Sequence, residues 1–149
     1  MPHELPASHC ATVLCQVPAP QALAFLADGL QLGRWALGCW DTTPAGEGMV
    51  RGHSLFDDQP SWVRPVMDRE RLAVVYHVGG APDALRPRIR AVVEPVEAAG
   101  QQPCCRISLH AERAPGMDDA RWLRLMRCHE VEVLLIQARL ALPPHSPVP

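Results

Sequence analysis

The chain has 149 residues, of which 48% are hydrophobic and 20% are charged, and its formal net charge is −2. This length suffices for one domain with a buried core and is too short for two ordinary domains. The near-neutral charge balance argues against a nucleic-acid-binding protein, which would carry a clustered basic excess. All 14 basic residues are arginines, so a mechanism that needs a lysine base or a lysine Schiff base is excluded.

The six cysteines of the chain form no CxxC pair and no zinc-ribbon spacing. The first residues lack the basic start and the apolar stretch of a signal peptide. The longest uninterrupted aliphatic stretch, 133–136, is far too short to span a bilayer. We therefore expect a cytoplasmic protein whose thiols are reduced and act mostly as small core residues.

The first quarter of the chain predicts one strand and two short helices after a loose leader at 1–10. Residues 11–17 alternate small or apolar side chains with polar ones and end at a proline, which is typical of a strand. A proline at position 20 opens a helix-prone run over 21–27. A second short helix is expected over 30–37, where Gly38 ends it.

From residue 39 to residue 114 the pattern changes to strands that are separated by turn residues. Because the separators are short, neighbouring strands should be antiparallel and joined as a meander. The strands are expected at about 39–43, 48–56, 61–67, 71–79, 87–96 and 103–112.

One long helix is expected from Asp118 to about residue 142, because two aspartates at its start suit the helix dipole. An apolar stripe at helical spacing should face the core. The stripe consists of Trp122, Met126, His129, Val133, Ile136 and Leu140, whereas Arg121, Arg124, Glu132 and Arg139 are placed on the wetter side. The proline-rich residues 143–149 are expected to form a tail outside the single domain at 11–142.

This order of elements indicates an α+β domain, and particular residues resemble a known superfamily. They are the strand end at 17–20 that runs into a helix, the segment 25–28, Trp35, the exit at 38–40 and the terminal helix with Trp122. The pattern resembles the START-like or Bet v 1-like (SRPBCC) superfamily, including bacterial polyketide cyclase/dehydrase-type and Aha1-type domains. The resemblance implies a helix-grip fold, in which a curved antiparallel sheet of about seven strands wraps around a long C-terminal helix.

A bent sheet cannot touch one straight helix everywhere, so we expect an apolar gap with a few polar groups, where small ligands bind. In the families that the chain resembles, this gap holds lipids, sterols, polyketides or other hydrophobic molecules. The residues that we expect to bind the ligand are Trp35, His53, Trp62, Arg64, Tyr76, Trp122, Met126 and His129.

Alternation along the strands predicts which side chains face this gap. On the last two strands the inward residues should be Ile89, Ala91, Val93, Cys105, Ile107, Leu109 and Ala111. The faces of strands 48–79 stay open. If Trp62 and Tyr76 face the cavity, Arg64 accompanies Trp62 and could anchor an anion or a carbonyl group. Otherwise Arg64 packs its stem on Trp62 at a sheet edge.

His129 is the most informative single residue, because it lies on the apolar stripe of the terminal helix. It is expected to be a core or pocket-lining residue, and acid–base catalysis is the alternative. No carboxylate partner for it is identified by spacing. His110 and Glu112 share a strand face and could share a metal, but a solvated outer histidine is favoured, and no metal or cofactor is expected.

Three functions remain open on the sequence alone. The first is a binding domain for a small hydrophobic or amphipathic ligand, with no chemistry of its own. The second is an enzyme of the polyketide aromatase/cyclase type, in which a histidine or arginine polarises the substrate. The third is an Aha1-like protein-interaction module, which should expose an apolar patch. A homodimer is possible, and neither a nucleic-acid partner nor a membrane span is expected.

Overall fold

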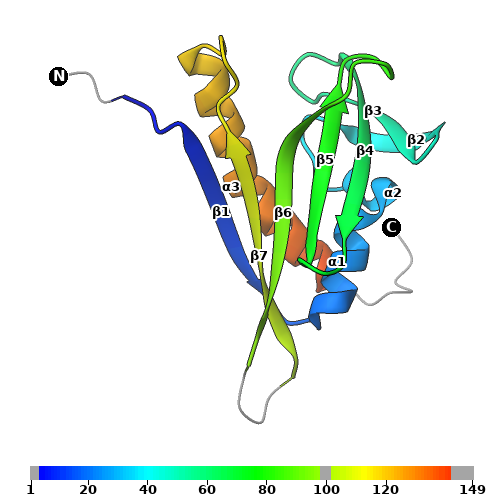
Figure 1. Ribbon diagram of the computed structural model, residues 1–149, viewed down its shortest axis with the longest axis vertical. Helices are drawn as coiled ribbons and strands as arrows, with labels where there is room; N and C mark the ends of the chain where they lie inside the picture. The colour runs from blue at the N-terminus through cyan, green and yellow to red at the C-terminus, as the bar shows by residue number, and fades with distance from the viewer. Residues whose placement is uncertain (1–3, 98–101, 142–149) are drawn as a thin grey trace.

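The structure, a computed structural model, describes residues 4–97 and 102–141 (Figure 1). Within these residues one antiparallel sheet of seven strands has the order β1-β7-β6-β5-β4-β3-β2. The strands are β1 (Ser8–Cys15), β2 (Trp40–Gly46), β3 (Met49–His53), β4 (Pro60–Asp68), β5 (Ala73–Gly79), β6 (Arg86–Val96) and β7 (Cys104–Glu112). The helices are α1 (Ala19–Ala27), α2 (Gly29–Leu32) and α3 (Asp119–Leu140). The expected α+β helix-grip architecture is therefore confirmed.

The register of the sheet assigns each side chain to one of two faces. Ala11 of β1 pairs with Leu109 of β7, Leu109 pairs with Ala91 of β6, and Ala91 pairs with Val74 of β5. All four side chains are buried, so they mark the inner face, which the helices cover. The inward residues expected on β6 and β7 lie on this face, as the alternation predicts.

The helices cover different parts of the inner face. α3 packs against β1 and β7, whereas α1 packs against β4, β5, β6 and β7. Asp118 caps α3, because its side chain accepts a hydrogen bond from the backbone N–H of Arg121 at 2.8 Å. α1 begins at a proline-containing first turn, where the missing N–H costs nothing.

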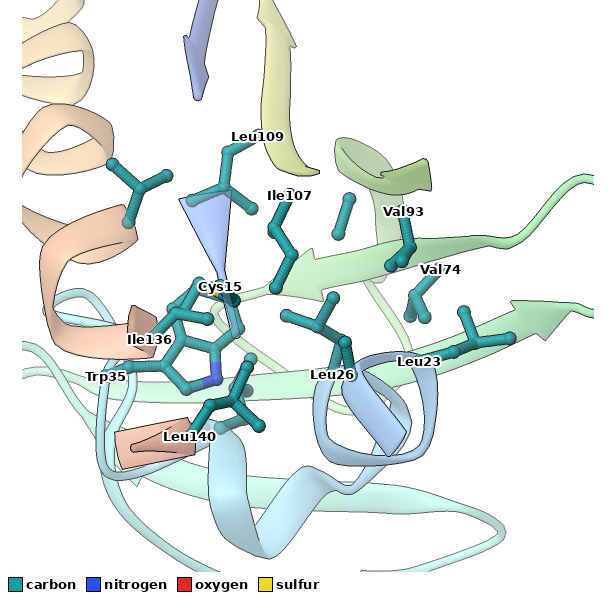
Figure 2. Packing of buried hydrophobic residues seen from close by; sticks show 14 of the residues in the cluster. Cys15, Leu23, Leu26, Trp35, Val74, Val93, Ile107, Leu109, Ile136 and Leu140 are labelled. Atoms are coloured by element: carbon teal, nitrogen blue, oxygen red, sulfur yellow. The ribbon is translucent and has the colours of Figure 1, made fainter. Parts of the chain in front are cut away.

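The main core lies where α1 and the second half of α3 meet the sheet (Figure 2). Trp35 lies beside Ile136 and Leu140 of α3, and Leu26 of α1 lies between them and the strands. A smaller cluster around Trp122, Met126 and Ala111 fills the space at the other end of α3. The indole N–H of Trp122 donates to the carbonyl oxygen of Pro6 at 2.7 Å, which fastens the segment before β1 to α3.

Two boundary predictions are wrong. β1 starts at Ser8 rather than after residue 10, because residues 8–10 extend the ladder with β7 up to Glu112. α2 ends at Leu32 rather than at residue 37. At Gly33 the chain approaches β2 so closely that a Cβ atom would collide with Thr42, and the N–H of Asp41 donates to the Gly33 carbonyl at 2.9 Å. The predicted tail at 143–149 lies outside the described residues.

Candidate functional site

A cluster of buried polar side chains lies on the inner face, where α3 meets β1 and the segment after α2. We call His9, His129 and Glu132 the inner polar cluster. Glu132 Oε2 accepts a hydrogen bond from the backbone N–H of Leu37 at 2.9 Å, and Glu132 Oε1 lies 3.8 Å from His129 Nε2. The rings of His9 and His129 are 6.3 Å apart. His129 and Glu132 are only 2% and 6% exposed, so this pair is shielded from water. His9 is partly exposed, and its Nε2 lies 3.7 Å from a carboxylate oxygen of Glu130.

The position of Glu132 corrects the sequence interpretation, which placed it on the wetter side of the helix. The residues that follow α2 pack over this part of α3 and bury the carboxyl group. Glu132 stands three residues after His129 and is therefore on the same side of the helix. His129 thus has the carboxylate neighbour that spacing alone did not identify, because the burial of Glu132 depends on a segment almost 100 residues earlier.

Burial sets the protonation of this cluster. It raises the pKa of Glu132 to about 8, against the opposing effect of the hydrogen bond from Leu37. Burial, and then the neighbouring His9, lower the pKa of His129 to about 4. At pH 7 the pair therefore consists mostly of a protonated carboxylic acid and a neutral imidazole. Such a pair can donate and accept hydrogen bonds without a buried charge.

Three buried nitrogen atoms in this part of the fold have no hydrogen-bond partner among the described residues. They are Nδ1 of His9, Nδ1 of His129 and Nε1 of Trp35. An unsatisfied buried polar atom costs about 1–3 kcal/mol. A polar group on a bound molecule would recover part of this cost, so these atoms mark a place where a ligand can be held.

Apolar side chains on the same face are only partly covered. Ile89 pairs with Tyr76 across the sheet, and Val78 pairs with the buried Val63, so both point to the inner face. Ile89, Val78 and Leu125 of α3 are half-buried. Val78 and Ile89 pack against the main core and Leu125 packs against the smaller cluster, and each keeps part of its surface uncovered.

Three of the eight expected ligand-binding residues lie in the main core or in the inner polar cluster. The rings of Trp35 and Tyr76 meet edge to face at 5.8 Å, and the Tyr76 hydroxyl donates to the carbonyl oxygen of Leu26 at 2.7 Å. His129 lies in the inner polar cluster. Trp122 and Met126 belong to the smaller core cluster and are placed further along α3.

The other three expected residues, His53, Trp62 and Arg64, lie on the outer face. Because Val63 points inward, Trp62 and Arg64 point outward by the two-residue period. Trp62 and Tyr76 therefore do not face one cavity, and the condition for an inward Arg64 is not met. The Arg64 guanidinium instead donates to the Glu47 carbonyl at 3.1 Å, while it is Arg51 that stacks on Trp62, at 5.2 Å.

His53 shares its strand face with Arg51, and its Nε2 lies 3.9 Å from a carboxylate oxygen of Asp58. This weak contact belongs to the loop between β3 and β4. His53 is therefore separated from the inner polar cluster by the thickness of the sheet.

A hollow of about 760 Å³ lies on the outer face, across β1, β7, β6 and β5. Its floor includes one row of paired residues across the four strands: Cys10 pairs with His110, His110 with Arg90, and Arg90 with Val75. This differs from the expected position of the cavity between sheet and C-terminal helix. There, the side chains of α1 and of the segment after α2 occupy much of the space (Figure 2).

Within the described ranges, no group of three or more His, Cys, Asp and Glu side chains is arranged to hold a metal ion. His110 and Glu112 therefore lack a third ligand in this part of the chain. No helix there combines the length and the hydrophobicity that a bilayer span requires.

No protein-family model and no curated protein sequence matches the chain. Solved structures do resemble it. The di-domain ARO/CYC BexL from the BE-7585A biosynthetic pathway superimposes with a TM-score of 0.66 at 18% identity, over 93% of this chain and 48% of that one. The chain thus spans about half the length of that two-domain protein.

Two further structures match over nearly their whole length. The ZhuI aromatase/cyclase from Streptomyces sp. R1128 has a TM-score of 0.57 at 16% identity. The match covers 89% of this chain and 92% of the ZhuI chain. The Aha1 dimer from Colwellia psychrerythraea has a TM-score of 0.61 at 15% identity, with 91% and 96% covered. Together with the sheet order and the long terminal helix, these matches show that the chain has the same helix-grip fold as these aromatase/cyclase and Aha1 structures.

Proposed function

We propose that the protein binds a small hydrophobic or amphipathic molecule on the inner face of the sheet. The polar end of the ligand contacts the inner polar cluster, and its apolar part lies over Val78, Ile89 and Leu125. The observation that carries the proposal is the set of buried nitrogen atoms without partners beside partly covered apolar side chains. Structures named aromatase/cyclase share the fold, which supports a small-molecule ligand for a domain of this fold.

The loop between β3 and β4 would control access to this face. Its residues Leu55 and Phe56 are 50% and 47% exposed, and the Arg124 guanidinium of α3 lies 4.7 Å from the centre of the Phe56 ring. A cation–π contact at such an exposed site contributes only about 0.5–1 kcal/mol. Separating the loop from α3 to admit a ligand is therefore energetically cheap.

A matched pair of substitutions tests which face binds the ligand. Val78→Asp places a charge on the inner face, whereas Val66→Asp places the same charge on the outer face of the neighbouring strand. We expect Val78→Asp to weaken binding of the neutral fluorophore 1-aminoanthracene at least tenfold, because a carboxylate must be desolvated beside the ligand. Val66→Asp should change binding less than twofold. Fluorescence titration measures both, and circular dichroism checks that each variant is folded. Equal effects of the two variants would overturn the proposal.

An enzyme of the aromatase/cyclase type is the second candidate, favoured by the protonation of Glu132 and His129. A carboxylic acid with a pKa of about 8 can donate a proton at neutral pH, and the adjacent neutral imidazole can accept one. On a β-ketothioester, the imidazole would take the α-proton while Glu132 protonates the carbonyl oxygen, which yields the enol. Proton exchange with solvent then restores both groups.

The enzyme candidate predicts catalysed exchange of the α-protons of the N-acetylcysteamine thioester of 3-oxobutanoate in D₂O. General acid–base catalysis contributes about a hundredfold or more to a rate. Glu132→Gln should therefore lower the exchange rate at least tenfold. The control is Cys128→Ala, since burial raises the pKa of the neighbouring Cys128 thiol to about 11 and leaves it unreactive. Exchange is followed by proton NMR. If the wild-type protein binds 1-aminoanthracene but does not raise the exchange rate above the uncatalysed rate, the enzyme candidate is wrong and only the binding function remains.

A further inference from the structure

Two arginines without an ion-pair partner in the described part of the chain line the hollow on the outer face. Arg88 and Arg90 of β6 both line it, and neither has a carboxylate within ion-pair distance among the described residues. By contrast, Arg106 on the same face pairs with Glu94 at 3.4 Å, and Arg113 at the rim pairs with Asp119 at 2.7 Å. Glu112 is the one carboxylate among the lining residues, so the two arginines leave a net positive floor.

Arg88 lies at an irregularity in the sheet, two residues before Arg90. Tyr76 of β5 pairs with Ile89, but the next residue, His77, pairs with Pro87. Arg88 is therefore an extra residue in β6, at a β-bulge, and it lines the hollow together with Arg90. Bulges concentrate beside binding sites because they redirect a side chain locally.

His110 completes the floor. It is directly opposite Arg90 on β6 and Cys10 on β1, and its Nε2 lies 3.8 Å from the Cys10 thiol. Partial burial, and then Arg90, lower the pKa of His110, while Glu94 opposes them. The imidazole is therefore neutral at pH 7 and free to share a hydrogen bond with an acceptor.

We propose that this hollow is a second binding site, which takes a small soluble molecule bearing a phosphate or carboxylate group. Arginine guanidinium groups bind such oxyanions through paired N–H donors. A volume of about 760 Å³ is within the usual range for small-molecule sites. The hydroxyl groups of such a molecule can donate to Glu112. Most of its lining residues belong to the outer face, although His9 and Ile89, which belong to the inner face, also line it. The proposal does not depend on the function proposed above.

The test is a proton NMR titration of the His110 imidazole at pH 7 with glycerol 3-phosphate and, separately, with citrate. The resonance is assigned by its loss in His110→Gln. A bound anion favours the imidazolium ion, so at least one compound should shift the resonance saturably and raise the pKa of His110 above its value in the free protein. Cys10, Arg90, Glu94 and Glu112 face this ring and are the groups that set the starting value.

Arg90→Gln and Arg88→Gln should each weaken binding about tenfold or more, as expected for lost hydrogen bonds to a charged group. Arg69→Gln is the matched control, because Arg69 is an exposed arginine in the turn after β4 and does not line the hollow. It should change the affinity less than twofold.

Three outcomes would overturn the proposal. They are equal weakening in all three variants, no saturable shift with either compound, and binding only to phosphatidylglycerol vesicles. Val78→Asp should leave this titration unchanged, which separates this site from the inner one.

Discussion

Replacing Tyr76 by Ala is expected to lower the free energy of unfolding by about 3–5 kcal/mol, the usual range for loss of a buried aromatic ring. Tyr76 is 1% exposed, its ring contacts Trp35, and its hydroxyl satisfies the Leu26 carbonyl. Trp62→Ala on the outer face should cost about 1 kcal/mol, because a half-buried side chain leaves no enclosed void. Urea unfolding followed by circular dichroism measures both values.

Tyr76→Phe separates the two contributions of this side chain. It keeps the ring and removes the hydroxyl, so the buried Leu26 carbonyl loses its donor and about 1–3 kcal/mol of stability is lost. If Tyr76→Ala and Trp62→Ala proved equally destabilising, the assignment of the two residues to opposite faces would be wrong.

The free energy of unfolding of the wild-type protein should fall as the pH rises, and Glu132→Gln is expected to remove this pH dependence. Burial raises the pKa of Glu132 from 4.5 to about 8, so between these values the folded state holds a proton that the unfolded state has released. Stability therefore falls with rising pH across this range, by an amount on the order of 5 kcal/mol. The glutamine keeps an oxygen that accepts from the Leu37 N–H, and it has no proton to lose.

His129 acts in the opposite direction and over a different range. Its pKa is lowered from 6.5 to about 4, so its contribution is complete above pH 6.5 and is lost as the pH falls toward 4. Between pH 6.5 and pH 8 the effect of Glu132 is therefore isolated. Urea unfolding at intervals across this range should show a falling stability for the wild type and a flat profile for Glu132→Gln. Glu70→Gln, which removes an exposed carboxylate in the turn after β4, should keep the wild-type slope. A flat wild-type profile would contradict the buried acid.

The local patterns were sufficient to predict the α+β order of elements, and the resemblance to START-like domains supplied the helix-grip arrangement. Each expected strand and helix is present, although α2 ends five residues before its predicted end. Short turns favour a meander, and a 22-residue amphipathic helix shows a clear helical period. Polar side chains such as Arg90, Glu94, Arg106 and His110 alternate with buried apolar ones along β6 and β7, so the inward faces of these strands were predicted correctly.

The candidate site could be predicted only in part, for two physical reasons. β4 carries apolar residues on both faces, Val63 and Met67 on one and Trp62 and Val66 on the other, so alternation could not identify its inner side. The burial of Glu132 depends on Leu37, a contact between segments 95 residues apart. No window of sequence around either residue contains that information, whereas His129, on the apolar stripe itself, was placed correctly in the interior.

The pairing of β1 with β7 has a consequence for how the chain folds. Thr12 and Ser108, which share a hydrogen bond between these strands, are 96 residues apart, and α3 packs mainly on β1. The early strand thus has neither its ladder partner nor its helix until most of the chain has been synthesised. Contacts of such high contact order form slowly, so completion of the native state waits for the ribosome to release the late elements. In the meantime β1 is an open edge, which is vulnerable to aggregation.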